Sequence, residues 1–209
     1  MRKKVDRRET AEELLPGAAP EVAIELMKDL HLLTRDGDLN ADARRKLKQI
    51  RHLLQLLAPA LDDVHARHGE PVVVDCGAGK SYLGFLMYAT RMARESKGRL
   101  VAIEARPELV EAARERARRF GCERMELVGG DIATAPLPPR VHLVTALHAC
   151  DTATDDAIAR GVAAGADWIA VVPCCRPRSP ASSPAAARPS RRWPRCAPIP
   201  GTAASSART

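Results

Sequence analysis

Aromatic side chains are scarce in this sequence, which has 209 residues but only two each of Trp, Tyr and Phe. Its hydrophobic core must therefore be built mostly from Leu, Val, Ala and Ile. No apolar run approaches the length of a membrane span, and the basic start is not followed by a signal-peptide core. The six cysteines show no framework spacing, which is typical of a reducing compartment. We therefore expect a cytoplasmic protein without a membrane partner, long enough for one α/β domain and an appendage.

Acidic residues are absent from residues 176–209, which contain seven arginines. The net charge of the whole chain is also +7, so residues 1–175 are formally neutral. The high net charge therefore describes the tail. It indicates no overall basic field on the rest of the chain that would attract nucleic acid.

Residues 71–84, PVVVDCGAGKSYLG, organise the rest of the chain. The β-branched run 72–74 is typical of a buried strand, and Asp75 follows it with a carboxylate. Gly77-Ala78-Gly79 then predicts a tight turn, and residues 81–88 are apolar enough to begin a helix. Such a turn binds ligands because glycines let them approach the backbone and the helix start offers unpaired N–H groups.

Three ligand classes use such a turn, and the spacing separates them. A P-loop needs an earlier glycine where Val74 stands, although Gly79-Lys80-Ser81 supplies its end. A dinucleotide fingerprint needs a third glycine where Tyr82 stands. The D-x-G-x-G pattern of class I S-adenosylmethionine-dependent methyltransferases is complete in residues 75–79. We favour this third class over a nucleotide site or a βα turn without a ligand.

Two further acidic residues follow predicted strands. Glu104 ends the strand 99–104, about one strand–helix–strand unit after Asp75, where a carboxylate can accept both ribose hydroxyls of a nucleoside. The alternative is that Glu104 only caps the helix that begins at Pro107. After the strand 123–128, Asp131 can accept the adenine amino group while Ile132 packs on the ring.

The alternation of strands and helices predicts a Rossmann-like, doubly wound, mostly parallel sheet over residues 70–175, with ligands at the carboxyl ends of the strands. Residues 1–69 predict an N-terminal helical module packed against it. In this module Leu47, Ile50, Leu54, Leu57 and Leu61 share one helix face. We expect Pro59 to bend or divide this helix.

A second stripe of the same helix is basic, with Arg44, Lys48 and Arg51. The simpler interpretation is a solvated helix face. The alternative is a contact with RNA or another anionic substrate beside the active site.

Several blocks together resemble a subgroup of class I methyltransferases: VVDCGAGKSYLG, VAIEARPELVEAA, VGGDI, ALHACDTATDDAI and VVPCC. The resemblance covers residues 20–175, and the LHACD and PCC blocks are specific to the subgroup. It implies S-adenosylmethionine as cofactor, held by Asp75, Gly77, Gly79, Glu104 and Asp131. It also implies a sheet of about seven strands, of which the last two are antiparallel.

The residues that face the transferred methyl group are expected at the end of the fourth strand: His148, Cys150 and Asp151. His148 can take a proton from the acceptor, and Asp151 can orient it. The alternative is that His148 caps backbone and Cys150 is a small buried residue. A zinc site or a redox pair with Cys174-Cys175 is disfavoured, because no C-x-x-C occurs, and we predict no metal.

Residues 176–209 depart from the pattern of the subgroup, which continues with a helix and two strands. Arg, Pro, Ser and Ala make up 28 of these 34 residues, so a core cannot form from them. One interpretation is a natural disordered tail. We favour a change of reading frame, because the composition shifts so abruptly. Synonymous codons can be chosen for residues 176–184 so that one inserted base gives Gln-Ala-Glu-Val-Ala-Arg-Leu-Leu-Ala, the start of an amphipathic helix. We then expect the last strands of the fold to be missing.

These observations predict an S-adenosylmethionine-dependent methyltransferase whose acceptor is an RNA, a protein or a small molecule. An N-P-P-[YF] tetrapeptide, which many enzymes that methylate amino groups of nucleic acids carry, is absent after the fourth strand. The alternative function is a cofactor-binding or interaction protein that is inactive because its C-terminal strands are lost.

Overall fold

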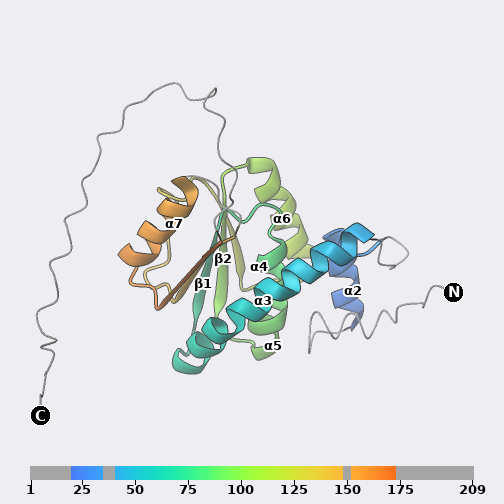
Figure 1. The fold of residues 1–209 in the computed structure, drawn as a ribbon, viewed down its shortest axis with the longest axis horizontal. Coiled ribbons are helices and arrows are strands. Elements are labelled where there is room, and N and C mark those ends of the chain that lie inside the picture. The colour runs from blue at the N-terminus through green and yellow to red at the C-terminus, as the bar shows by residue number, and fades with distance from the viewer. Residues whose placement is uncertain (1–19, 35–40, 148–151, 173–209) are drawn as a thin grey trace, which may run out of the picture. The chain divides into compact units, whose positions relative to one another are not determined.

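The computed structural model describes residues 20–34, 41–147 and 152–172, which all belong to one compact unit spanning residues 1–176 (Figure 1). The tail 176–209 lies outside the described residues. The elements follow one another as α2 (Pro20–Asp29), α3 (Ala41–Arg67), β1 (Val72–Cys76), α4 (Tyr82–Met87), the π-helical turn η1 (Tyr88–Met92), α5 (Ala93–Glu95), β2 (Arg99–Glu104), α6 (Pro107–Arg119), β3 (Met125–Gly129), β4 (Leu143–Leu147), α7 (Thr152–Ala163) and β5 (Trp168–Val172).

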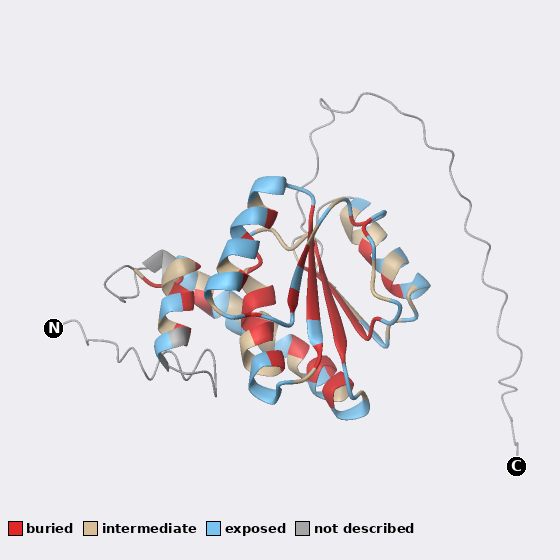
Figure 2. Ribbon diagram, turned by 180° about the vertical axis from the view of Figure 1, so that it is seen from behind, coloured by how far each residue is buried: buried red, intermediate tan, exposed pale blue. Residues whose placement is uncertain are grey.

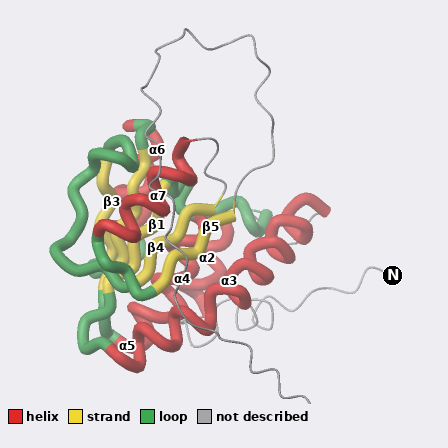
Figure 3. Tube along the Cα trace, turned by 60° about the vertical axis from the view of Figure 1, so that its left-hand side comes forward, coloured by secondary structure: helices red, strands yellow, loops and turns green. Residues whose placement is uncertain are grey.

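The strands lie together in one sheet (Figure 3). Their order is β3-β2-β1-β4-β5, and every neighbouring pair is parallel. The strand order reverses between β1 and β4, as in a doubly wound sheet. The predicted fold class is therefore confirmed, including the adjacency of the fourth and fifth strands. The two antiparallel strands that the resemblance implies do not occur among residues 20–34, 41–147 and 152–172.

Each face of the sheet has its own core, because alternate residues of a strand point to opposite faces. Val73, Leu100 and Leu143 pack with α2, α3, α4, η1 and α6 on one face. Val74, Val101 and Val144 pack with α7 and the segment before β4 on the other. Figure 2 shows buried strands in the middle of the sheet, and β1, β2 and β4 are buried along almost their whole length. Strands buried on both faces explain the nearly continuous apolar runs in the sequence.

Helix α3 crosses one face of the sheet in front of α4 (Figure 1) and buries Leu47, Leu57 and Leu61 in the first core. The predicted apolar stripe of this helix is therefore present. The expectation that Pro59 divides the helix is wrong, since α3 runs from Ala41 to Arg67 through this residue. Pro59 and Gln55, four residues earlier, are both exposed, so the carbonyl that loses its helical hydrogen bond can bond to water instead.

No helix in the described part of the chain is long and apolar enough to cross a membrane.

Candidate functional site

The turn after β1 is built by three residues with positive φ. Gly77 and Gly79 have φ values of 68° and 59°, which glycine adopts without strain, and Ser81 adopts 57°. The N–H of Ala78 donates to the carbonyl of Ile103 over 2.9 Å. The N–H of Gly79 donates to Oε2 of Glu104 over 2.7 Å. The glycine turn is therefore tied to the end of the neighbouring strand β2, and not only to its own helix.

Asp75 is buried beneath this turn, with 4% of its surface exposed. The hydroxyl of Thr145 on β4 donates to Asp75 Oδ1 over 2.8 Å. Burial raises the pKa of the Asp75 carboxyl to about 6, although the hydrogen bond from Thr145 acts in the opposite direction. The carboxyl is therefore charged at neutral pH, and burying this charge lowers the stability of the folded state.

The hydroxyl of Ser81 lies beside Asp75 and is also buried. It has no hydrogen-bond partner among the described residues. A Cβ added to Gly84 would lie 2.6 Å from Ser81 Oγ and 3.5 Å from Asp75 Oδ2, so the two polar groups enclose the same narrow space. Only a glycine fits at position 84 without displacing one of them.

Glu104 ends β2 and gathers donors from two segments. Its Oε1 accepts the backbone N–H of Arg106 over 3.1 Å and Arg106 Nε over 2.8 Å, in addition to the Gly79 bond at Oε2. Burial by itself would raise the pKa of the Glu104 carboxyl, but these hydrogen bonds outweigh it and hold the pKa below its usual value. Glu104 bonds the N–H of Arg106, the residue before α6, and its bond to Gly79 links it to the glycine turn.

Asp131 and Ile132 follow β3 at the same edge, because Glu104 is paired with Gly129 in the sheet. Asp131 is exposed, and its Oδ1 accepts the N–H of Ala133 over 2.8 Å. The side chain of Ile132 is buried in the core of the second face. The assignment of these two residues to the adenine stays a prediction.

The loop that carries Asp131 is fixed by Arg160 of α7. The two terminal nitrogens of Arg160 donate to the carbonyls of Ala133 and Ala135. Arg160, Arg106 and Thr145 are not among the site residues predicted from the sequence. Thr145 could have been noticed as the one polar residue in the apolar run of β4. Nothing in the sequence distinguishes Arg106 and Arg160 from the other arginines.

A cavity of about 200 Å³ lies between the start of α3 and the glycine turn. Asp75, Ala78 and Tyr82 line it from the turn, and Leu147 lines it from the end of β4. Its remaining lining comes mostly from apolar residues of α3 and its neighbours, together with two polar residues: Leu32, Ile50, Leu53, Leu83, Lys46 and Gln49. The cavity thus connects the turn to the strand end that precedes His148.

His148, Cys150 and Asp151 lie outside the described residues, as do Cys174 and Cys175. Their predicted roles, and the disfavoured metal site, therefore remain untested by the geometry. The structure describes Leu147, the last residue of β4, at the edge of the sheet that also carries the glycine turn.

A second cluster of chemically active groups lies at the opposite edge of the sheet. Atoms of His68, His142 and Asp167 that can hold a metal are within 4.8 Å of one another. The N–H of Val72 donates to His142 Nδ1 over 2.9 Å, which places the ring proton on Nε2. Burial lowers the pKa of His142, which keeps that ring neutral. His68 Nε2 and Arg140 both bond to Asp167, at 2.8 and 3.1 Å, so the cluster links the starts of β4 and β5 to the end of α3.

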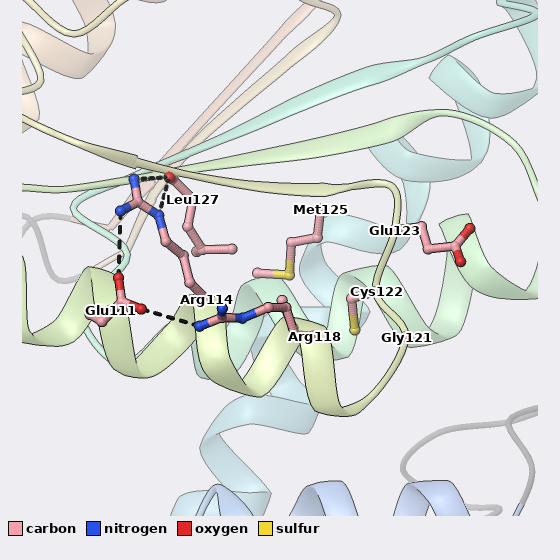
Figure 4. Close-up of a pocket in the computed structure, with 9 residues that line it drawn as sticks. Glu111, Arg114, Arg118, Gly121, Cys122, Glu123, Met125 and Leu127 are labelled. Atoms are coloured by element: carbon pink, nitrogen blue, oxygen red, sulfur yellow. Dashed lines mark hydrogen bonds and ion pairs between the residues drawn. The ribbon is translucent and has the colours of Figure 1, made fainter.

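A larger groove of about 560 Å³ runs between α6 and β3 (Figure 4). Arg114 donates from Nε and Nη2 to the carbonyl of Leu127, at 3.2 and 2.9 Å, and thereby covers a carbonyl of the edge strand β3. Glu111 pairs with Arg114 and Arg118 along the same helix. The lining of this groove includes none of the predicted site residues.

Comparison with known proteins identifies the family. Residues 45–178, more than half of the chain, match the model of a family described as a methyltransferase domain. No curated protein matches the chain.

Among solved structures, the chain is similar to an rRNA methylase from Streptococcus thermophilus, with 14% identity and a TM-score of 0.40 over 51% of this chain and 60% of that one. It is similar to the 23S rRNA methyltransferase ErmE, with 19% identity and a TM-score of 0.43 over 57% of this chain and 45% of that one. It is also similar to a SAM-dependent methyltransferase from Aquifex aeolicus, with 18% identity and a TM-score of 0.38 over 57% and 66%. The chain thus spans less than two thirds of the length of each of these structures. On the family match, the chain belongs to the methyltransferase domain family.

Proposed function

We propose that this chain binds S-adenosylmethionine at the carboxyl edge of β1, β2 and β3 and transfers its methyl group to an acceptor. One observation carries the proposal: the Asp75-x-Gly77-x-Gly79 turn is joined to Glu104 by the hydrogen bond from the Gly79 N–H. This bond brings the two most informative motifs of the sequence into one site. The same motifs would be unrelated if the turn served only to connect β1 with α4.

The residues present fit a nucleoside with an amino-acid arm. Glu104 offers a carboxylate for a ribose diol, and the glycine turn lacks side chains where the backbone meets a ligand. Ser81 adds a buried hydroxyl that has no partner within residues 20–34, 41–147 and 152–172. The residues that we propose to hold the cofactor are Asp75, Gly77, Ala78, Gly79, Glu104, Asp131 and Ile132.

When bound, S-adenosylmethionine supplies a methyl group activated on a sulfonium. The contribution of this chain is then to align an acceptor with that methyl group and to exclude water. In the sequence, His148, Cys150 and Asp151 come directly after Leu147, which ends β4 and lines the cavity. We assign to His148 the removal of a proton from the acceptor and to Asp151 its orientation.

The acceptor is proposed to be RNA, contacted through Arg44, Lys48 and Arg51. Residues 43–61 contain no acid, and these three side chains are exposed on the half of α3 that borders the cavity. An acceptor that enters the cavity from this side would meet a positive surface. We also propose a cytoplasmic location, because the six cysteines do not have the spacing of a disulfide framework.

The test is transfer of tritium from methyl-labelled S-adenosylmethionine to separated RNA, protein and small-molecule fractions of a cell extract. We expect label in RNA, lost in His148→Ala and reduced when Arg44, Lys48 and Arg51 are changed to Gln. Label in another fraction would contradict the RNA acceptor. Cofactor binding without any transfer would contradict the enzymatic proposal and favour a binding protein.

The matched control for the basic residues is a triple change of Arg94, Arg99 and Arg118 to Gln. These three arginines are also exposed, but they lie on α5, β2 and α6 rather than on the basic half of α3. This control removes the same charge, so an equal loss of activity would indicate a general charge effect rather than a binding surface.

A further inference from the structure

The carboxylate of Glu104 is already fully bonded in this structure. Oε2 accepts the Gly79 N–H over 2.7 Å and Arg106 Nη2 over 3.4 Å. Oε1 accepts the Arg106 N–H over 3.1 Å and Arg106 Nε over 2.8 Å. A carboxylate has about four acceptor positions, so none is left for a ligand that must donate two hydrogen bonds.

The four donors are of two kinds. The N–H groups of Gly79 and Arg106 belong to the backbone and stay in place while the fold is intact. The guanidinium of Arg106 stands at the end of a side chain that is 61% exposed, against 9% for Glu104. Its Nη2 lies 3.9 Å from the position of a Cβ on Gly79, so it extends across the glycine turn. The two bonds that can be released without unfolding the chain therefore both come from the Arg106 side chain, which lies where a nucleoside would bind.

We propose that the Arg106 side chain occupies the ribose position of Glu104 in the free protein and must leave before a nucleoside binds. Arg106 then sets the affinity and the salt dependence of the cofactor site. This inference rests on the proposed function, which assigns Glu104 to the ribose hydroxyls.

The released guanidinium has an acidic neighbour to move toward. Glu108, in the first turn of α6, is exposed and its charge already acts on Arg106. When Arg106 moves, it therefore gives up a partly buried ion pair with Glu104 and gains an exposed ion pair with Glu108. An exposed ion pair is weak and is screened by salt, so the cost of displacing Arg106 is expected to be about two- to fivefold in affinity.

The probe for this proposal is 5′-methylthioadenosine, which has a ribose diol and no net charge. Its binding to the full chain is measured by titration calorimetry at low and at high NaCl concentration. A neutral probe removes the attraction between a charged ligand and the arginine, so that a change with salt reports the Glu104–Arg106 pair. The 2′-deoxy analogue, which lacks one of the hydroxyls, tests whether the ribose is the competing group.

We expect Arg106→Gln to bind this probe about two- to fivefold more tightly than the wild type at low salt. Added salt should tighten binding to the wild type and leave Arg106→Gln unchanged, and the 2′-deoxy analogue should show a smaller difference between the proteins. Arg106→Lys, which keeps the charge but loses the Nε bond, should lie between them. The control Arg99→Gln, at the far end of β2, should behave as the wild type.

Equal affinity and equal salt dependence in wild type and Arg106→Gln would overturn the inference. Weaker binding by Arg106→Gln would also overturn it, because Arg106 would then be a ligand for the nucleoside. In both cases Glu104→Gln still weakens binding if the proposed function is right. Absence of binding by every folded protein would instead overturn the proposed function together with the inference.

Discussion

Replacement of Asp75 by Asn is expected to stabilise the protein at neutral and alkaline pH. The carboxyl of Asp75 is buried and has a pKa of about 6, compared with an ordinary value of 3.8. Asn has nearly the same shape and can keep the hydrogen bond from Thr145, since its Oδ1 accepts equally well. The change therefore removes the buried charge and keeps the hydrogen bond.

The pH dependence follows from the direction of this shift. Below about pH 3.8 the carboxyl is protonated in the folded and the unfolded chain, so the group has no effect on stability. Between pH 3.8 and pH 6 only the folded chain keeps the proton, so the free energy of unfolding falls as pH rises. Above pH 6 the folded state carries the whole cost of the buried charge. A shift of about two units corresponds to roughly 3 kcal/mol, of which about half develops between pH 5 and pH 8.

The assay is urea unfolding at pH 5 and pH 8, followed by circular dichroism. We expect the advantage of Asp75→Asn over the wild type to grow by about 1.5 kcal/mol between the two pH values. The control Asp155→Asn, an exposed position on α7, should show little change between them. An advantage that is the same at both pH values, or a loss of stability only at pH 8, would refute the reasoning about the buried charge.

The remaining predictions concern one glycine and one hydroxyl. Gly98→Ala should lower the free energy of unfolding by about 2–4 kcal/mol, because φ is +74° there and the new Cβ would lie 2.6 Å from the Pro71 carbonyl oxygen. Urea unfolding measures this, and Gly69→Ala, which has open space, should cost little. Thr145→Val removes the donor to Asp75 and should cost about 1–2 kcal/mol at pH 8 and less at pH 5. An equal loss at both pH values would point to packing instead.

Much of the fold is readable from the sequence because its signals are local. The strand predicted at residues 99–104 coincides with β2, since a run buried on both faces is bounded by Gly98 and by Glu104. Of the two outcomes expected at Pro59, the division of the helix is wrong, because the proline rule takes no account of the exposure of Pro59 and Gln55.

The site is less readable because its decisive contacts join distant segments. The D-x-G-x-G spacing predicts the turn, but the Thr145–Asp75 bond spans 70 residues and depends on β1 and β4 being neighbours. The burial of Asp75 and its raised pKa follow from that packing rather than from its own motif. The occupation of Glu104 by Arg106 depends on a side-chain conformation that no spacing specifies.

The central claim is that the edge formed by Asp75, Gly79 and Glu104 binds S-adenosylmethionine. Titration calorimetry of S-adenosylhomocysteine into the purified full chain tests it most directly, with Glu104→Gln as the site variant and the exposed Glu126→Gln of β3 as control. The account predicts binding to a single site that Glu104→Gln weakens at least about tenfold and Glu126→Gln leaves unchanged. A folded protein that binds no S-adenosylhomocysteine, or that binds it equally well in all three forms, would contradict the account.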